Sequence, residues 1–260
     1  MKNTFFILII AALCCKISLA QIGERTIVQK KDTLVTIPFC AVSLGYTMPY
    51  GEMGNRYRSF MDLGVDIGWK NKNNWLFNFN VGFQFGSNNV KILNQVLSGM
   101  MTTDDEPFVV SVGGVDAAVI AWNRNLSGKF SVGKVVPLWF SNQNSGLMLM
   151  LGAGYLQHQI MYQATNDIAP QLEGDYALLY DRQMRGPMLS SFIGYLFFGK
   201  YTFANFYAGI QYDIAFTKLT RKYQADLRGG DPNWYSDRML TLKAAWIFQF
   251  HNPTSERIYY

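Results

Sequence analysis

The chain has 260 residues, of which 49% are hydrophobic and 15% aromatic, and its formal net charge is +5. Residues 1–20 contain two lysines and no acidic residue, so the charge of the remainder is (23 − 2) − 18 = +3. A surplus of positive charge this small favours neither a nucleic acid nor a strongly acidic partner. No phosphate-binding loop, nucleotide motif or metal-ligand cluster occurs in the sequence, so we expect neither a cofactor nor a metal.

Residues 1–20 predict a signal peptide that exports the chain. Lys2 supplies the positive start, residues 5–15 are an unbroken apolar run, and residues 18–20 (Ser-Leu-Ala) fit the small-x-small pattern before a cleavage site. The apolar run is too short to cross a bilayer as a helix. Residues 21–35 would then be a periplasmic N-terminal segment.

After the signal peptide, the sequence contains no apolar run of about 18 residues, so we expect no transmembrane helix. Cys40 would be the only cysteine of the mature chain, so no intramolecular disulfide can stabilise it. An exported, aromatic-rich chain without a spanning helix has one membrane fold open to it. That fold is the closed β-barrel, because only a closed sheet satisfies every backbone N–H and C=O in lipid.

Two segments joined by a polar turn give the clearest structural pattern. Residues 61–70 and 75–86 alternate with a period of two, which predicts β-strands, since successive side chains of a strand point to opposite faces. Large apolar residues occupy alternate positions: Met61, Leu63, Val65, Ile67 and Trp69, then Trp75, Phe77, Phe79, Val81, Phe83 and Phe85. Strands of about 10 residues with an apolar outer face and short turns are typical of transmembrane β-barrels.

Further segments alternate in the same way, but one region changes phase. The regular ones are residues 36–46, 147–161, 187–198, 203–218 and 240–250. Within 114–138 the apolar set moves from odd to even positions near 123–128. This region is either one strand with a β-bulge or a hairpin of two strands.

Loop lengths favour one bulged strand. The long connections at 47–59, 87–113, 164–186 and 220–236 alternate with short ones at 71–74, 139–146 and 199–202 only in that case. We therefore predict an all-β fold in the cell outer membrane: an antiparallel eight-stranded transmembrane β-barrel over residues 36–250. It would have four long external loops, short periplasmic turns and a periplasmic C-terminal tail at 251–260. Aromatic residues at the short-turn ends agree with this orientation: Trp69, Trp75, Trp139, Phe198 and Tyr201.

The inward positions of this barrel carry charges of both signs. The predicted interior polar network consists of Asp62, Asp66, Lys70, Asp116, Lys129, His158, Asp213 and Lys243. An eight-stranded barrel is only wide enough for its own side chains, so paired charges would plug it. A proton or ion path along the acidic residues is the alternative.

His158 offers one enzymatic alternative. A lipid-modifying barrel enzyme needs a histidine base near a nucleophile, and Ser190 or Ser191 on the following strand could approach His158. No spacing identifies a nucleophile, however. We therefore expect no enzyme activity and no catalytic residues.

The external loops hold the candidate interaction residues. Residues 93, 96, 97 and 100 are apolar at helical spacing, which predicts a short amphipathic helix. Interface-favoured Tyr, Trp and Arg occur with acidic residues in the later loops: Tyr176, Tyr180, Asp181, Arg182, Arg221, Trp234 and Tyr235. These residues either contact a partner, such as another envelope protein, or rigidify the loops. Outer-membrane lipid is the other expected partner.

Several blocks of sequence resemble a family of small outer-membrane β-barrels from Bacteroidota that has no assigned activity. They are residues 45–54 (GYTMPYGEMG), 144–146 (NSG), 151–158 (LGAGYLQH) and 205–209 (NFYAG), and the Ala20-Gln21 junction is similar to exported proteins of that phylum. The architecture also looks like the small barrels that serve type IX secretion. The resemblance implies an outer-membrane barrel and supplies no catalytic or binding residue.

These patterns together predict a barrel with a plugged interior that serves as a structural or accessory subunit of an envelope machine for secretion or assembly. The alternatives are a lipid-modifying enzyme that uses His158 and a narrow channel or transporter.

Overall fold

The computed structural model describes residues 34, 36–103, 108–138, 143–165, 167–199 and 205–249. The expected signal peptide at 1–20 and the expected tail at 251–260 lie outside the described residues, as does all of 21–35 except Leu34. Among the residues described, no helix is both long and apolar enough to cross a membrane.

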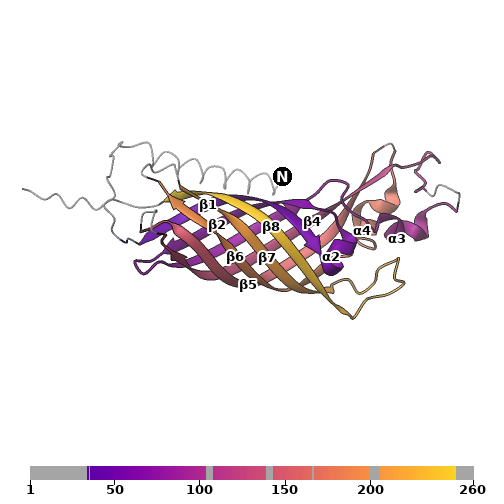
Figure 1. Cartoon of the computed structure of the whole chain (residues 1–260). Helices are drawn as coiled ribbons and strands as arrows, with labels where there is room; N and C mark the ends of the chain where they lie inside the picture. Colours follow the sequence, from indigo (N-terminus) through magenta and orange to yellow (C-terminus); the bar gives the residue numbers. More distant parts are fainter. Residues whose placement is uncertain are drawn as a thin grey trace, which may run out of the picture. The chain divides into compact units, whose positions relative to one another are not determined.

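Eight antiparallel strands close into a barrel in which each strand pairs with its neighbours in the chain and the last pairs with the first (Figure 1). They are β1 (Ile37–Tyr50), β2 (Phe60–Lys70), β3 (Trp75–Phe85), β4 (Val119–Val136), β5 (Gly146–Ala164), β6 (Met184–Phe198), β7 (Asn205–Leu219) and β8 (Trp234–Gln249). Closure removes the open sheet edges at which unpaired N–H and C=O groups would meet lipid. The predicted eight-stranded antiparallel barrel is confirmed.

β4 is one continuous strand without the expected bulge. Its ladder with β5 runs unbroken from the pair Val119–Ala164 to the pair Val136–Leu147. The phase change in the sequence arises because the inward face of β4 is apolar at Ala121, beneath the external loops, and polar farther along the strand. The prediction of a single strand is correct, and the prediction of a bulge is wrong.

The two faces of the barrel differ in polarity. Outward side chains form an exposed apolar belt, which includes Val42, Leu44, Val65, Ile67, Phe79, Val81, Leu151, Ile193, Ile210 and Leu242. Inward positions on the same strands are buried, and many of them are polar. Since alternate positions of a strand face opposite sides, the period of two in the sequence is the origin of both faces.

The two ends of the barrel carry different connections (Figure 1). At one end β2 and β3 are joined by the short turn 71–74. At the other end lie α2 (Gly51–Arg56), α3 (Leu93–Leu97) with the 3₁₀ turn η1 (Ser98–Met100), η2 (Pro170–Leu172) and α4 (Gly174–Ala177). The helix expected near residues 93–100 forms as α3 and η1. Bacterial barrels keep their long loops outside the cell, so the end with the helices is external.

The interior is arranged in three layers. A periplasmic layer of apolar side chains includes Phe39, Leu76, Met148, Phe192 and Ile247. An external layer, which lies under the loops, includes Met53, Tyr57, Leu156, Ile160 and Met239. Between them lies a middle layer of buried polar side chains, which includes Asp62, Asp66, Asn78, Lys129, Gln211, Asp213 and Lys243. The middle layer is therefore closed off by apolar side chains on both sides.

Candidate functional site

Asp66 is the centre of one half of the middle layer. It is fully buried, and its two carboxylate oxygens accept hydrogen bonds from Asn78 Nδ2 at 2.7 Å and from the Tyr207 hydroxyl at 3.0 Å. Lys243 Nζ lies 3.6 Å from Asp66 Oδ2. Side chains from three other strands thus meet at one carboxylate. A buried charge needs such compensation, because an unpaired one costs several kcal/mol.

The other half of the middle layer contains a second ion pair and a chain of amides. Lys129 Nζ on β4 lies 3.7 Å from Asp213 Oδ1 on β7, across the barrel. Gln84 Nε2 donates to Asp62 Oδ2 at 2.7 Å, and Asn125 Nδ2 donates to Gln84 Oε1 at 3.1 Å. Both signs of charge that the sequence places inward are therefore in contact with partners.

Little space remains between these side chains. A cavity lined by Asn78, Lys129, Gln211, Lys243 and neighbouring residues has a volume of about 10 Å³. A cavity needs roughly this volume to hold a single water molecule.

Two further residues predicted for the interior network lie outside the middle layer. Lys70 is buried at the periplasmic end of β2, where its Nζ donates to Asn144 Oδ1 at 2.9 Å. Asp116 does not lie in the barrel. It precedes β4, is exposed, and its Oδ1 accepts a hydrogen bond from Ala118 N at 2.9 Å. Its prediction as an interior residue is wrong, because β4 begins only at Val119 and its inward positions are the odd-numbered ones.

His158 lies in a separate cluster near the external end, which we call the mouth cluster: Arg56, Tyr57, His158, Thr217 and Asp237. His158 is fully buried, with Nε2 3.0 Å from Asp237 Oδ2 and Nδ1 3.3 Å from the Tyr57 hydroxyl. Thr217 Oγ1 donates to the same Asp237 oxygen at 2.5 Å, and Arg56 Nη1 lies 3.7 Å from Asp237 Oδ1. Both ring nitrogens of His158 therefore have partners.

The structure does not bring Ser190 or Ser191 to His158. His158 pairs with Met184 on β6, whereas Ser190 pairs with Gly152, six residues farther along the ladder. Six residues of strand correspond to roughly 20 Å. Ser191 also faces outward, where its Oγ donates to the backbone oxygen of Tyr212 at 3.3 Å. The nucleophile and base considered from the sequence are thus far apart.

Sequence reasoning missed four members of the mouth cluster. Asp237 and Thr217 are inward on β8 and β7, and their position parity relative to Asp213 and Lys243 could have identified them. Arg56 and Tyr57 come from α2 and the residue that follows it. No period in the sequence indicates where such a connection folds back over the barrel.

Most of the predicted loop residues make contacts within the external end of the protein. Arg221 Nη2 donates to Asp181 Oδ2 at 2.6 Å, and the hydrogen bond to Asp181 raises the pKa of Arg221. Arg182 forms a second ion pair with Asp226. Both pairs join the β5–β6 loop to the β7–β8 loop. The Tyr162 hydroxyl donates a hydrogen bond to the backbone oxygen of Tyr180 at 2.8 Å. These contacts favour the interpretation that the residues rigidify the loops.

A small external pocket lies beside the mouth cluster. Its volume is about 180 Å³, and its lining includes Glu52, Arg56, Arg182, Asp231 and Tyr235. The Arg56 guanidinium lies 4.7 Å from the centre of the Tyr235 ring, and the Tyr235 hydroxyl donates to Asp231. That hydrogen bond lowers the pKa of Asp231. The pocket carries both signs of charge, and most of its charged groups are already paired.

Two predicted loop residues remain open to solvent. Tyr176 is 65% exposed and Trp234 is 62% exposed. Among the described residues, no group of three or more His, Cys, Asp or Glu side chains could hold a metal ion.

The closed sheet and its outer surface identify the environment of the chain. Exposed Val, Leu, Ile and Phe side chains surround a barrel whose middle layer is polar, whereas a soluble β-protein buries its apolar face and exposes its polar one. The protein is an outer-membrane β-barrel. Lipid contacts the belt, and the long loops face the outside of the cell.

No protein-family model matches the chain, and no curated protein matches it in sequence. Among solved structures it is similar to Neisserial surface protein A, with a TM-score of 0.42, 9% identity and coverage of 82% of this chain and 97% of that one. It is also similar to Ail, the attachment invasion locus protein of Yersinia pestis, in complex with the heparin analogue sucrose octasulfate (TM-score 0.42, 10% identity, 82% and 99% covered). A major outer membrane protein from Thermus thermophilus has a TM-score of 0.38 and 11% identity, with 81% and 99% covered. At these values the likeness carries no information about function.

Proposed function

We propose that this outer-membrane barrel is non-conducting and serves as a structural or accessory subunit of a larger envelope assembly, such as a secretion or assembly machine. The middle layer supports the first half of the proposal, and the exposed loop surface supports the second. The residue blocks similar to small Bacteroidota barrels agree with this proposal, and membership of that group is part of it.

The middle layer supports a barrel without an open pore. The ion pair Lys129–Asp213 crosses the lumen, the pair Lys243–Asp66 joins β8 to β2, and all four side chains are at most 7% exposed. Apolar layers cover them at both ends. An ion that entered would have to break these pairs and leave a buried charge uncompensated.

Conductance tests this half directly. We expect purified protein in planar bilayers to show no single-channel steps at any voltage. A general porin in the same bilayers is the positive control and should give steps. Steady conductance of the unaltered protein would instead support the narrow-channel alternative.

A group of exposed apolar side chains on the external loops carries the second half of the proposal. We call it the loop patch: Val110, Val112, Val115 and Ile168, which are 40%, 69%, 56% and 58% exposed. Val112 N donates to Ile168 O at 3.0 Å, and Ser111 N donates to Val115 O at 2.9 Å, so the two loop segments are held side by side. Unlike the belt, these residues lie beyond the strands, where lipid cannot cover them. Rigid apolar side chains in water are typical of protein–protein contacts.

Photo-cross-linking in living cells tests the accessory role. A cross-linking amino acid at Val112 should capture a specific envelope protein, because this side chain is the most exposed of the loop patch. The same amino acid at Glu173, an exposed polar position in the neighbouring loop, is the matched control and should capture nothing. Recovery of the chain alone from both positions would contradict the accessory role.

We do not extend the proposal to catalysis. His158 is fully buried with both ring nitrogens partnered, and no serine of the described residues lies beside it in the mouth cluster. The lipid-modifying alternative predicts that His158→Ala changes lipid A in a mass spectrum, and we expect an unchanged profile.

A further inference from the structure

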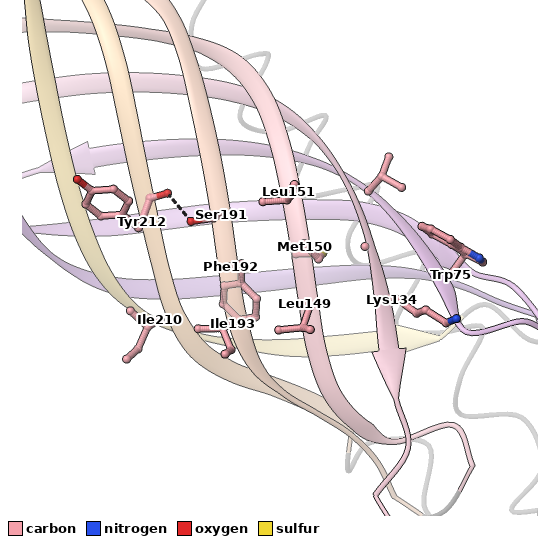
Figure 2. Close-up of a pocket in the computed structure, with 12 residues that line it drawn as sticks. Trp75, Lys134, Leu149, Met150, Leu151, Ser191, Phe192, Ile193, Ile210 and Tyr212 are labelled. Atoms are coloured by element: carbon pink, nitrogen blue, oxygen red, sulfur yellow. Dashed lines mark hydrogen bonds between the residues drawn. The ribbon is translucent and has the colours of Figure 1, made fainter.

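A hollow on the lipid-facing side of the barrel has no part in the proposed function. Its volume is about 450 Å³, within the range of roughly 300–1,000 Å³ that is usual for ligand sites. It extends across β3 to β7 (Figure 2). Its lining consists of Trp75, Val132, Gly133, Lys134, Leu149, Met150, Leu151, Ser191, Phe192, Ile193, Ile210 and Tyr212.

Two rows of outward side chains form the walls of this hollow. The strand register places the first row in the order Trp75, Lys134, Leu149, Ile193 and Ile210. The second row follows the order Val132, Leu151, Ser191 and Tyr212. Figure 2 shows both rows side by side across the strands. The rows are two residues apart on each strand, roughly 7 Å, which leaves a trough between them.

The trough has the length and slope of a lipid acyl chain. Four strand-to-strand steps from β3 to β7 cover roughly 19 Å, since neighbouring strands lie about 4.8 Å apart. Strands of such barrels tilt by about 35–45°, so the trough rises by roughly 12 Å along the membrane normal. One leaflet of the hydrocarbon core is about 15 Å deep. A trough of this size fits one leaflet and does not extend through both.

One end of the trough carries a cation at the depth of lipid headgroups. Lys134 lies near the periplasmic end of β4, is exposed, and its Nζ is 5.8 Å from the centre of the Trp75 ring. Trp and Lys are the residues that anchor barrels at the membrane interface. Of the described residues that line the hollow, only Lys134 is charged. A single negative charge at this end would meet a single positive one.

We propose that this hollow is a binding site for one phospholipid of the periplasmic leaflet. The phosphate is held by Lys134 beside Trp75, and one acyl chain lies in the trough between the two rows. Ser191 has the smallest side chain of the second row, and the acyl chain of the lipid passes over it. This site is distinct from the interior and from the loop patch, so its test is independent of the proposed function.

Native mass spectrometry of the full chain in a mild nonionic detergent tests the proposal. The probes are phosphatidylglycerol and a diacylglycerol with the same acyl chains, which differ only in the headgroup. We expect one phosphatidylglycerol to bind about fivefold more tightly than the diacylglycerol, the contribution of one interfacial cation. Lys134→Gln should remove this preference, and Lys134→Arg should retain it. Arg124→Gln is the matched control, because Arg124 is an outward cation in the external half of the same strand.

A second variant tests the trough itself. Ser191→Phe places a large side chain in the second row and should lower the binding of both lipids at least fivefold, while the lipid-facing position lets the barrel fold. Folding of every variant is checked by its heat-dependent mobility on a gel. Equal binding of the two lipids to the unaltered protein, or an unchanged preference in Lys134→Gln, would overturn the proposal. Undiminished binding to folded Ser191→Phe would overturn it as well.

Discussion

The middle layer and the mouth cluster are both buried sets of charged groups, but the chain builds them differently. In the middle layer Asp66, Lys129, Asp213 and Lys243 all project from strands. The mouth cluster places Asp237 and His158 on strands and adds Arg56 from α2. The middle layer is therefore assembled when the barrel closes, whereas the mouth cluster is complete only when a loop folds over the rim.

Because of this difference, we expect the middle layer and the mouth cluster to stabilise different parts of the protein. The two ion pairs fill the lumen together with amide side chains such as Asn78 and Gln84. The mouth cluster includes Arg56 from the connection between β1 and β2, so it holds this external loop in place. Changes in the middle layer should thus affect the whole barrel, and changes at the mouth should affect the loops first.

The largest expected effect concerns which end is outside. In a Cys40→Ser background, a membrane-impermeant maleimide should label Asp175→Cys in α4 on intact cells. It should label Asn73→Cys in the β2–β3 turn only after the outer membrane is permeabilised. Asn73 and Asp175 are both exposed, whereas Asn144 in the β4–β5 connection is only 4% exposed and accepts from Lys70. Labelling of Asn73→Cys in intact cells would place the mouth cluster in the periplasm.

The middle layer should be the most sensitive part of the interior. Asp66→Ala leaves Lys243 without its carboxylate in a buried site, so the free energy of unfolding should fall by about 3–5 kcal/mol. Urea unfolding of protein refolded into lipid vesicles measures it. Asp66→Asn with Lys243→Met removes both charges and should cost much less. Equal losses in the two variants would mean that the charges are not coupled.

The sequence could predict much of the middle layer and little of the mouth. Position parity identifies the inward side chains of each strand, and Asp66 and Lys243 are found in this way. It does not show which strands face each other across the barrel, so the pair Lys129–Asp213 needed the structure. Asp116 was placed wrongly because it precedes β4 and because the inward positions of that strand are odd-numbered.

The loops were less predictable for a physical reason. Their conformation depends on long-range contacts, such as those between the β5–β6 and β7–β8 loops, which leave no period in the sequence. Tyr, Arg and Asp indicated that the loops matter, and two interpretations remained open for them. Only the observed ion pairs separate Asp181 and Arg221, which bind each other, from Tyr176, which faces solvent.

A smaller effect should follow from a change in the mouth cluster. Tyr57→Phe removes the hydroxyl that meets His158 Nδ1 and leaves that nitrogen buried without its partner. The free energy of unfolding should fall by about 1–3 kcal/mol in the vesicle assay. Tyr155→Phe, on the exposed face of β5, is the control and should have no effect. A loss as large as that of Asp66→Ala would contradict the difference between the two regions.

The ion pairs between loops should act locally. Arg221→Gln breaks the pair with Asp181 that joins two loops, and partly exposed pairs contribute about 0.2–1 kcal/mol. Limited proteolysis of the external loops should therefore accelerate by up to about fivefold, while urea unfolding of the barrel stays unchanged. The exposed neighbour Lys222→Gln is the matched control. A shift in barrel unfolding would mean that the loops and the strands unfold together.

The smallest expected effect is a change in the titration of one carboxyl group beside the external pocket. The Tyr235 hydroxyl donates to Asp231 and lowers its pKa. Because the folded pKa is below the unfolded one, this contribution to stability is present above the unfolded pKa, about 3.9. It is lost as the pH falls through the folded pKa.

Tyr235→Phe deletes the donor and leaves the ring beneath Arg56, so the pKa of Asp231 should rise towards its ordinary value. The carboxyl carbon shift of Asp231, followed by NMR across the acidic range, measures the change. Thr102→Val, in a different external loop, is the control and should leave the titration in place. An unmoved midpoint in Tyr235→Phe would mean that backbone groups of the β7–β8 loop hold the carboxylate. In that case the β7–β8 loop alone would hold Asp231 in place at the external pocket, and Tyr235 on β8 would not contribute.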